Sequence, residues 1–186
     1  MMRKWKYLAV YLTPALVALS IYLPGWWSYT ALIVLFGILP AIELFSKGST
    51  VNVTKAEEEM ILQDKTYDWM LYGLVPVQYL LLVYFLFVMQ QDYPFYEWLG
   101  NVIAFGLSCG VIGINAAHEL GHRLTKQEQN MSKALLLTSL YMHFFIEHNR
   151  GHHKNVSTDE DPASAKYGET IFAFYVRSVI GSWLSA

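Results

Sequence analysis

The sequence has few charged residues, a single cysteine and no histidine before residue 118. Charged residues make up 15% of the 186 residues, against about 25% in soluble domains, and 54% of residues are hydrophobic, which favours a membrane protein. The single cysteine, Cys109, excludes a disulfide within the chain and a thiolate metal cluster. The formal net charge is −2 without a basic patch, so we expect no nucleic-acid partner.

Four apolar stretches contain no lysine or arginine and are long enough to cross a bilayer as helices. A helix needs about 20 apolar residues to span the hydrocarbon core, with somewhat shorter spans at the lower limit. The stretches cover residues 7–23, 29–45, 69–89 and 98–117. The sequence therefore predicts an all-α fold, a polytopic membrane helical bundle that forms a single membrane domain over residues 1–186.

The basic residues predict how these spans are oriented. Twelve of the 13 basic residues lie before the first span, between the second and third spans, or after the fourth span. These three segments share one face of the membrane, and an excess of lysine and arginine marks the cytoplasmic face. Every histidine follows the fourth span, so we expect the histidines on the cytoplasmic side. The residues are Arg3, Lys4, Lys6, Lys47, Lys55, Lys65, Arg123, Lys126, Lys133, Arg150, Lys154 and Lys166.

Two later apolar segments, residues 134–146 and 170–186, are expected to form interfacial helices. The first segment is too short for a span, and a crossing there would separate the later histidines from the earlier ones. In the second segment apolar residues recur at helical spacing, with Arg177 on the opposite face, which is typical of a helix in the headgroup plane. The chain ends at Ala186 without a polar tail, so we expect an incomplete domain.

All six histidines lie within one short region, from His118 to His153. His118 and His122 are four residues apart, so on a helix continuing from the fourth span they would share one face, about 6 Å apart along the axis. His148 and His152 repeat this spacing, and His153 adds another imidazole. Imidazole binds iron, copper, nickel and zinc. Five ligands in two clusters exceed one tetrahedral zinc site, which predicts two metals or one large shared site.

Several nearby groups are candidates for contacts around the metal ligands. Metal-bound imidazoles usually donate their other N–H to an acceptor, and Glu43, Glu119 and Glu147 are candidate acceptors. The alternative for each is a solvated or interfacial charge. His143, five residues before His148, is expected to be a group outside the ligand set or a pocket residue, and direct metal ligation is the alternative.

Three acidic residues, Asp159, Glu160 and Asp161, precede Pro162. We expect them to form an exposed acidic turn, and the docking of a redox partner is the alternative for this segment.

Two other functions compete for the same histidines. Residues 118–122 match HExxH, in which two histidines bind zinc and the glutamate is the general base of a metalloprotease. A membrane zinc protease would leave most of the later histidines unexplained. A metal carrier or sensor is a further alternative, but it would need ligands along a transmembrane path rather than at one end of the spans.

The two histidine clusters resemble a known pattern. Residues 115–123, NAAHELGHR, and residues 147–153, EHNRGHH, followed by EDPAS at 160–164, resemble the first two histidine boxes of the membrane alkane 1-monooxygenases. The second box is long and specific. The similarity extends along the whole chain, because four spans before the first box are typical of that family.

The resemblance implies a non-haem diiron enzyme of the bacterial inner membrane that hydroxylates the terminal methyl of alkanes. O2 is then the co-substrate, rubredoxin the electron donor, and the alkane comes from the lipid bilayer. By this resemblance the ligands of the two iron ions include His118, His122, His148, His152 and His153, and no catalytic residue beyond the ligands is assigned.

This sequence departs from the family pattern in one respect. The family carries further histidine boxes, and nothing in these 186 residues matches them. We therefore expect a fragment that carries about half of the ligand set and is inactive alone. Other histidine-box enzymes, the desaturases and the sterol or xylene hydroxylases, are the alternatives within this superfamily.

Overall fold

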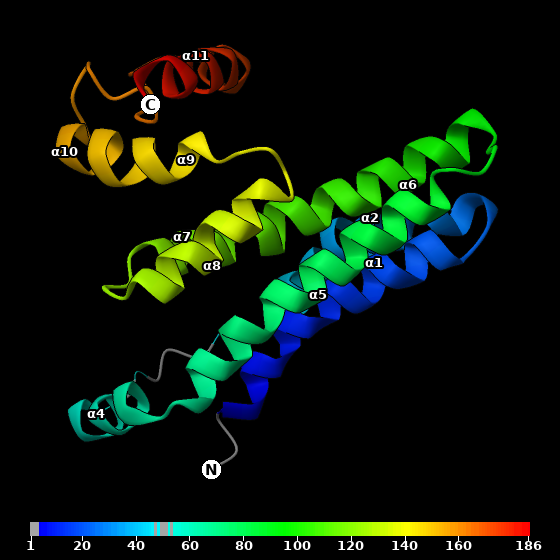
Figure 1. Cartoon of the computed structure of the whole chain (residues 1–186), viewed down its shortest axis with the longest axis horizontal. Helices are drawn as coiled ribbons and strands as arrows, with labels where there is room; N and C mark the ends of the chain where they lie inside the picture. The colour runs from blue at the N-terminus through cyan, green and yellow to red at the C-terminus, as the bar shows by residue number, and fades with distance from the viewer. Residues whose placement is uncertain (1–3, 47, 49–51, 53) are drawn as a thin grey trace. The chain divides into compact units, whose positions relative to one another are not determined.

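The computed structural model describes residues 4–46, 48, 52 and 54–186, and these residues form helices joined by turns, with no strand among them (Figure 1). The predicted all-α class is confirmed. Two basic residues used to predict the orientation, Arg3 and Lys47, lie outside the described residues.

Four helices are long and apolar enough to cross a membrane, and they correspond to the four predicted spans. They cover Lys4–Tyr22, Gly25–Phe45, Thr66–Val88 and Phe95–Gly121. Each begins three or four residues before its predicted span. The chain is therefore an integral membrane protein built as a helical bundle.

Three of these spans combine several helical elements. The first consists of the 3-10 helix η1 (Lys4–Tyr11) and α1 (Leu12–Tyr22). The second consists of η2 (Gly25–Tyr29), α2 (Thr30–Ile33), η3 (Val34–Ile38) and α3 (Leu39–Phe45). α4 (Lys55–Gln63) precedes α5 (Thr66–Val88), which is the third span. The fourth consists of α6 (Phe95–Ser108), η4 (Cys109–Ile114) and α7 (Asn115–Gly121).

The residues group into two compact units, Met1–Gly113 and Ile114–Ala186, where the sequence predicts a single membrane domain. In the first unit α1 packs against α2, α5 and α6, and the long helices run alongside one another in Figure 1. Its core contains Val17, Leu81 and Phe105, and the Phe105 ring stacks on Phe85 with centroids 4.5 Å apart. Interlocked apolar side chains therefore hold the spans of this unit together.

Some buried polar groups of the first unit have partners within the bundle, whereas the Oδ1 atom of Asn101 has no hydrogen-bond partner among the described residues. Ser20 is fully buried, and its hydroxyl oxygen accepts a hydrogen bond of 2.8 Å from the backbone N–H of Ala31. Pro40 lies two residues after the end of the π-helical segment η3, as expected where a proline removes an N–H from the helical ladder.

The second unit contains short helices around the histidines. After α7 come α8 (Lys126–Leu137), α9 (His143–Ile146), the π-helix η5 (Glu147–His152), α10 (His153–Asn155) and α11 (Ile171–Ser185). In Figure 1, α9 and α10 lie along one line and α11 runs beside them, and α11 contacts both α9 and η5.

The predicted single helix over residues 134–146 is wrong, because α8 ends at Leu137 and α9 begins only at His143. Leu140 has a φ of 55°, and the N–H groups of Leu140 and Tyr141 bond to the carbonyls of Leu137 and Leu136. These two bonds form a Schellman motif, which ends a helix. Glycine usually occupies the left-handed position. Because Leu140 occupies it here, no glycine marks the helix end within the apolar run.

The predicted helix over residues 170–186 is present as α11. The hydroxyl of Thr170 accepts a bond from the N–H of Ala173 and caps the helix. Its apolar side chains, including Phe172, Val176 and Leu184, are exposed, whereas Ser182 is buried. The polar face of α11 thus packs on the protein, and its place at the membrane surface stays a prediction.

Candidate metal centre

The first pair of histidines lies on the last turn of the fourth span. His118 and His122 come from α7 and its C-terminal cap, and their Nε2 atoms are 3.2 Å apart. α8 holds this turn in place, because the Ser132 hydroxyl donates a bond of 2.6 Å to the carbonyl of Ala117. Gly121 lets α8 approach closely, since a Cβ at this position would lie 3.2 Å from the Ser132 Oγ. The sequence prediction of one shared face holds for this pair.

The second histidine cluster lies in contact with the first. The Nε2 atom of His148 lies 3.0 Å from that of His122 and 3.1 Å from that of His153. His118, His122 and His148 each offer a ligand atom within 4.8 Å of the others. The two histidine boxes therefore converge, and four Nε2 atoms form a chain of consecutive contacts from His118 through His122 and His148 to His153.

The π-helical turn decides which histidines pair in the second box. η5 covers Glu147–His152, and in a π-helix the bonded residues are five apart rather than four. His148 is consequently matched with His153. The rings of His148 and His152 also lie side by side, stacked with centroids 5.5 Å apart, but Nδ1 of His152 lies against the carboxylate of Asp161.

His152 binds a buried carboxylate. Its Nδ1 atom lies 2.8 Å from Oδ2 of Asp161, whose side chain has no exposed surface. The prediction of an exposed acidic turn is therefore wrong for Asp161, although it holds for Asp159 and Glu160. Asp161 is thus a contact of a candidate ligand that was not predicted from the sequence. The signal was its place before Pro162 and Ser164, where an aspartate commonly bonds to its own turn.

The acceptors proposed from sequence lie elsewhere. Glu119 forms an ion pair with Arg123 at 3.1 Å, and Glu147, which is 4% exposed, accepts a hydrogen bond from the Ser185 hydroxyl of α11. Glu43 is exposed on α3, which belongs to the first unit. None of the hydrogen bonds found within the described residues joins these three carboxylates to a histidine.

His143 lies among aromatic side chains. Its ring is 4.4 Å from the Tyr141 ring and 4.6 Å from the Trp183 ring of α11, measured between centroids. Within the part of the chain that the structure describes, neither of its ring nitrogens has a hydrogen-bond partner. Burial lowers the pKa of His143, and the charge of Glu147 opposes this. Of the roles expected for His143, its surroundings match that of a pocket residue, because it lines a cavity with Trp183.

The geometry of the imidazole cluster fits a metal cation. Each Nε2 carries at most one hydrogen, so the Nε2 atom of His148 cannot make two good hydrogen bonds to its two neighbours. Ligands about 2.0–2.1 Å from one tetrahedral ion would have nitrogens about 3.3 Å apart. The observed separations of 3.0–3.2 Å are close to this value. Burial, and then the neighbouring imidazoles, lower the pKa of His148 to about 4, which keeps its lone pair available.

Comparisons with known proteins agree with this arrangement. Residues 96–186 match the family described as fatty acid desaturase, which covers both histidine boxes. Alkane 1-monooxygenase 1 of Alcanivorax borkumensis is 33% identical over 181 residues, covering 94% of this chain and 45% of that protein. The alkane 1-monooxygenase of Acinetobacter baylyi is 35% identical over 157 residues, covering 83% and 38%. The chain is a relative of the alkane 1-monooxygenases.

A third relative shows the same extent of similarity. The alkane 1-monooxygenase of Ectopseudomonas oleovorans is 31% identical over 192 residues, covering 99% of this chain and 47% of that protein. The chain thus spans about half the length of the curated relatives that it matches. The resemblance found in the histidine boxes is confirmed, and these relatives imply a histidine-ligated metal centre at the converging imidazoles.

Proposed function

We propose that the protein hydroxylates the terminal carbon of alkanes to primary alcohols, with O2 as co-substrate, at a diiron centre to which this chain contributes two histidine boxes. The observation that carries the proposal is the convergence of four Nε2 atoms, with consecutive separations of 3.0–3.2 Å, from two boxes that the sequence separates. Relatives named alkane 1-monooxygenase support the reaction.

His118, His122, His148 and His153 would hold iron through their Nε2 atoms, and His152 would be the fifth ligand from this chain. Iron bound there would supply the electron-transfer chemistry that the reduction of O2 requires. The chain's own contribution is to orient these imidazoles, and burial lowers the pKa of His148. The low pKa of His148, about 4, means that this side chain needs no deprotonation before it binds a cation at neutral pH.

The substrate would be bound by burial alone. An alkane has no polar group, so its affinity comes from the transfer of methylene groups out of water or lipid, at most about 0.8 kcal/mol for each one. The spans contribute many apolar side chains, and a hydrocarbon would enter from the bilayer rather than from water. The selectivity for chain length would then depend on the shape of the apolar surface and not on hydrogen bonds.

We further propose that the protein lies in the bacterial inner membrane with the histidines on the cytoplasmic side, where a rubredoxin would reach them. The distribution of basic residues supports this orientation, because the turns at residues 24–28 and 90–97 contain no lysine or arginine.

The rival zinc protease is less well supported by the geometry. Its general base would be Glu119, and the carboxylate of this residue is engaged by Arg123 at 3.1 Å. A protease site would also leave the fourth converging imidazole, His153, without a role.

The test uses the full-length protein purified in detergent. Elemental analysis should find two irons per chain, and reduced rubredoxin with octane and 18O2 should yield 1-octanol that carries the label. The His122→Ala variant should lose both iron and product. One zinc with peptide cleavage, a desaturated product, or reversible metal binding without turnover would overturn the proposal in favour of the protease, a desaturase or a carrier.

A further inference from the structure

Asp161 differs from its acidic neighbours in burial. It is 1% exposed, whereas the side chain of Asp159, two residues earlier, is 97% exposed and lies 3.8 Å from Lys166. A buried carboxylate is stable only when hydrogen bonds replace its lost hydration. The partners of Asp161 therefore indicate why the chain places a charge there.

Three donors surround the Asp161 carboxylate. The N–H of Ala163 donates to Oδ1 at 2.9 Å, and the Ser164 hydroxyl donates to Oδ2 at 2.5 Å. The third partner is Nδ1 of His152, at 2.8 Å from Oδ2. An ionised carboxylate only accepts hydrogen bonds, so Nδ1 of His152 must carry the proton. The Nε2 atom of the same ring then bears the lone pair.

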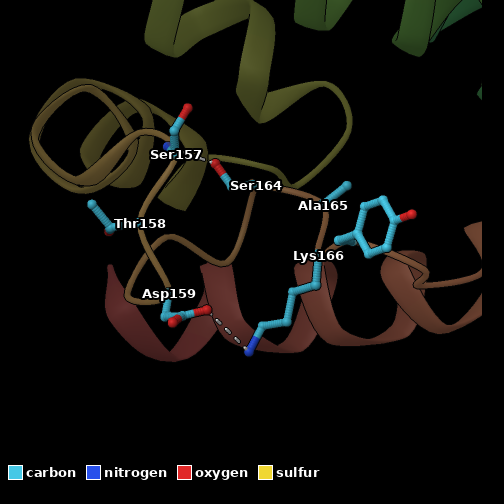
Figure 2. Close-up of a pocket in the computed structure, with 7 residues that line it drawn as sticks. Ser157, Thr158, Asp159, Ser164, Ala165 and Lys166 are labelled. Carbon is cyan, nitrogen blue, oxygen red and sulfur yellow. Dashed lines mark hydrogen bonds and ion pairs between the residues drawn. The ribbon is translucent and has the colours of Figure 1, made fainter.

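The turn that carries Asp161 is itself held from two sides. The backbone N–H of Ser157 donates to the Ser164 hydroxyl oxygen at 2.9 Å, the contact drawn in Figure 2. Arg177 of α11 donates to the carbonyls of Pro162 and Ser164 at 3.2 and 2.8 Å. The carboxylate is thus fixed before any ligand binds.

We propose that Asp161 is a positioning residue for the metal centre: it fixes the His152 ring with Nδ1 protonated, so that Nε2 faces the metal as a ligand. This role rests on the proposed function, because it assumes a metal at the histidines. His152 needs such a partner more than the other histidines do, since its contacts among them are ring contacts, stacked on His148 at 5.5 Å and T-shaped to His153 at 5.8 Å between centroids.

The first test reads the tautomer of His152 in the metal-free protein. The full-length protein is labelled with 15N-histidine, stripped with a chelator and compared with Asp161→Asn. The wild type should show His152 with Nδ1 protonated. In Asp161→Asn this resonance should move toward a mixture of tautomers, because an amide can donate as well as accept. An unchanged His152 resonance in the variant would overturn the proposal, whatever metal the protein binds.

The second test measures metal affinity, with Asp159→Asn as the matched control on the same turn. Loss of an outer partner of a metal-bound histidine typically lowers affinity by about 10–100-fold. We expect a decrease of this size for Fe2+ in Asp161→Asn, measured by competition with a chelator, and no decrease in Asp159→Asn. A changed Mössbauer spectrum of the iron that Asp161→Asn retains would distinguish a displaced ligand from partial unfolding.

The outcomes separate the two proposals. A wild-type protein that binds no iron contradicts the proposed function, and the tautomer test still decides the role of Asp161. A wild-type protein that binds two irons, with equal affinity in both variants, contradicts only the role of Asp161. If Asp161→Asn does not fold, Ser164→Ala keeps the carboxylate but removes one of its three donors, together with the contact from Ser157. It should reduce iron affinity by a smaller factor, and an unchanged affinity and spectrum would again contradict the role.

Discussion

His148 and His153 face each other across a π-helical turn, with their Nε2 atoms 3.1 Å apart. The α-helical spacing of four residues would have selected His152 as the partner. The extra residue in the turn brings His153 to the cluster and leaves His152 facing the Asp161 carboxylate. One backbone irregularity therefore gives two adjacent histidines different surroundings.

His148, like His122, lies between two other imidazoles of the cluster. We expect His148→Ala to reduce iron affinity by more than the 10–100-fold typical for the loss of an outer contact, because it removes a ligand. His143→Phe is the control, since its ring lies among Tyr141 and Trp183. It should keep the full iron content and should not lower Tm. Loss of iron from His143→Phe would contradict the assignment.

The sequence predicts those features that depend on short-range patterns. Apolar stretches without lysine or arginine locate all four spans, because a bilayer requires that length and composition. The clustering of histidines locates the site, since such a cluster has no role in an apolar core. The spacing of His118 and His122 on α7 is also correctly predicted.

The remaining features depend on backbone irregularities or long-range contacts. The Schellman motif at Leu140 lacks the glycine that would reveal it. The π-turn of η5 changes the helical register without a proline to mark it. The burial of Asp161 depends partly on Arg177, sixteen residues later in the sequence, which holds the turn that contains it.

The low pKa of His148 predicts how the stability of the metal-free protein depends on pH. Burial, followed by the neighbouring imidazoles, lowers this pKa from 6.5 to about 4. As the pH falls below 6.5 the unfolded chain takes up the proton first, so stability decreases until the folded protein is protonated near pH 4. Thermal unfolding after chelation should show Tm decreasing over this range, and His148→Gln should remove part of the slope. Equal slopes would contradict this assignment.

Gly151 makes room for the Glu147 carboxylate within the π-turn. A Cβ on Gly151 would overlap all three atoms of that carboxyl group. We expect Gly151→Ala to displace Glu147, to break its bond with Ser185 of α11 and to lower the iron content. The double variant Glu147→Ala/Gly151→Ala removes the overlap and should recover part of the iron content relative to Gly151→Ala. If the double variant binds less iron than Gly151→Ala, the overlap is not the cause.

Arg177 should control the loop that carries Asp161, because it joins α11 to that loop at several points. Its Nε and Nη2 atoms donate to the Glu169 carboxylate, each at 2.7 Å, and these bonds hold the pKa of Glu169 at about 2. Such paired, charge-assisted bonds are the strongest kind that arginine makes. Arg177→Gln keeps a donor but loses the charge and this two-point geometry.

We therefore expect Arg177→Gln to loosen the segment 157–169 at neutral pH and to expose it to proteases. The matched control is Lys166→Gln, which removes a charge from the same loop but only a 3.8 Å contact with the exposed Asp159. Limited proteolysis should cut Arg177→Gln within this segment several-fold faster than wild type. A rate increase of this size corresponds to a loss of about 1 kcal/mol in local stability. Iron affinity should fall with it, since Asp161 would no longer be fixed against His152. Equal cleavage rates in the two variants would show that the loop does not depend on Arg177.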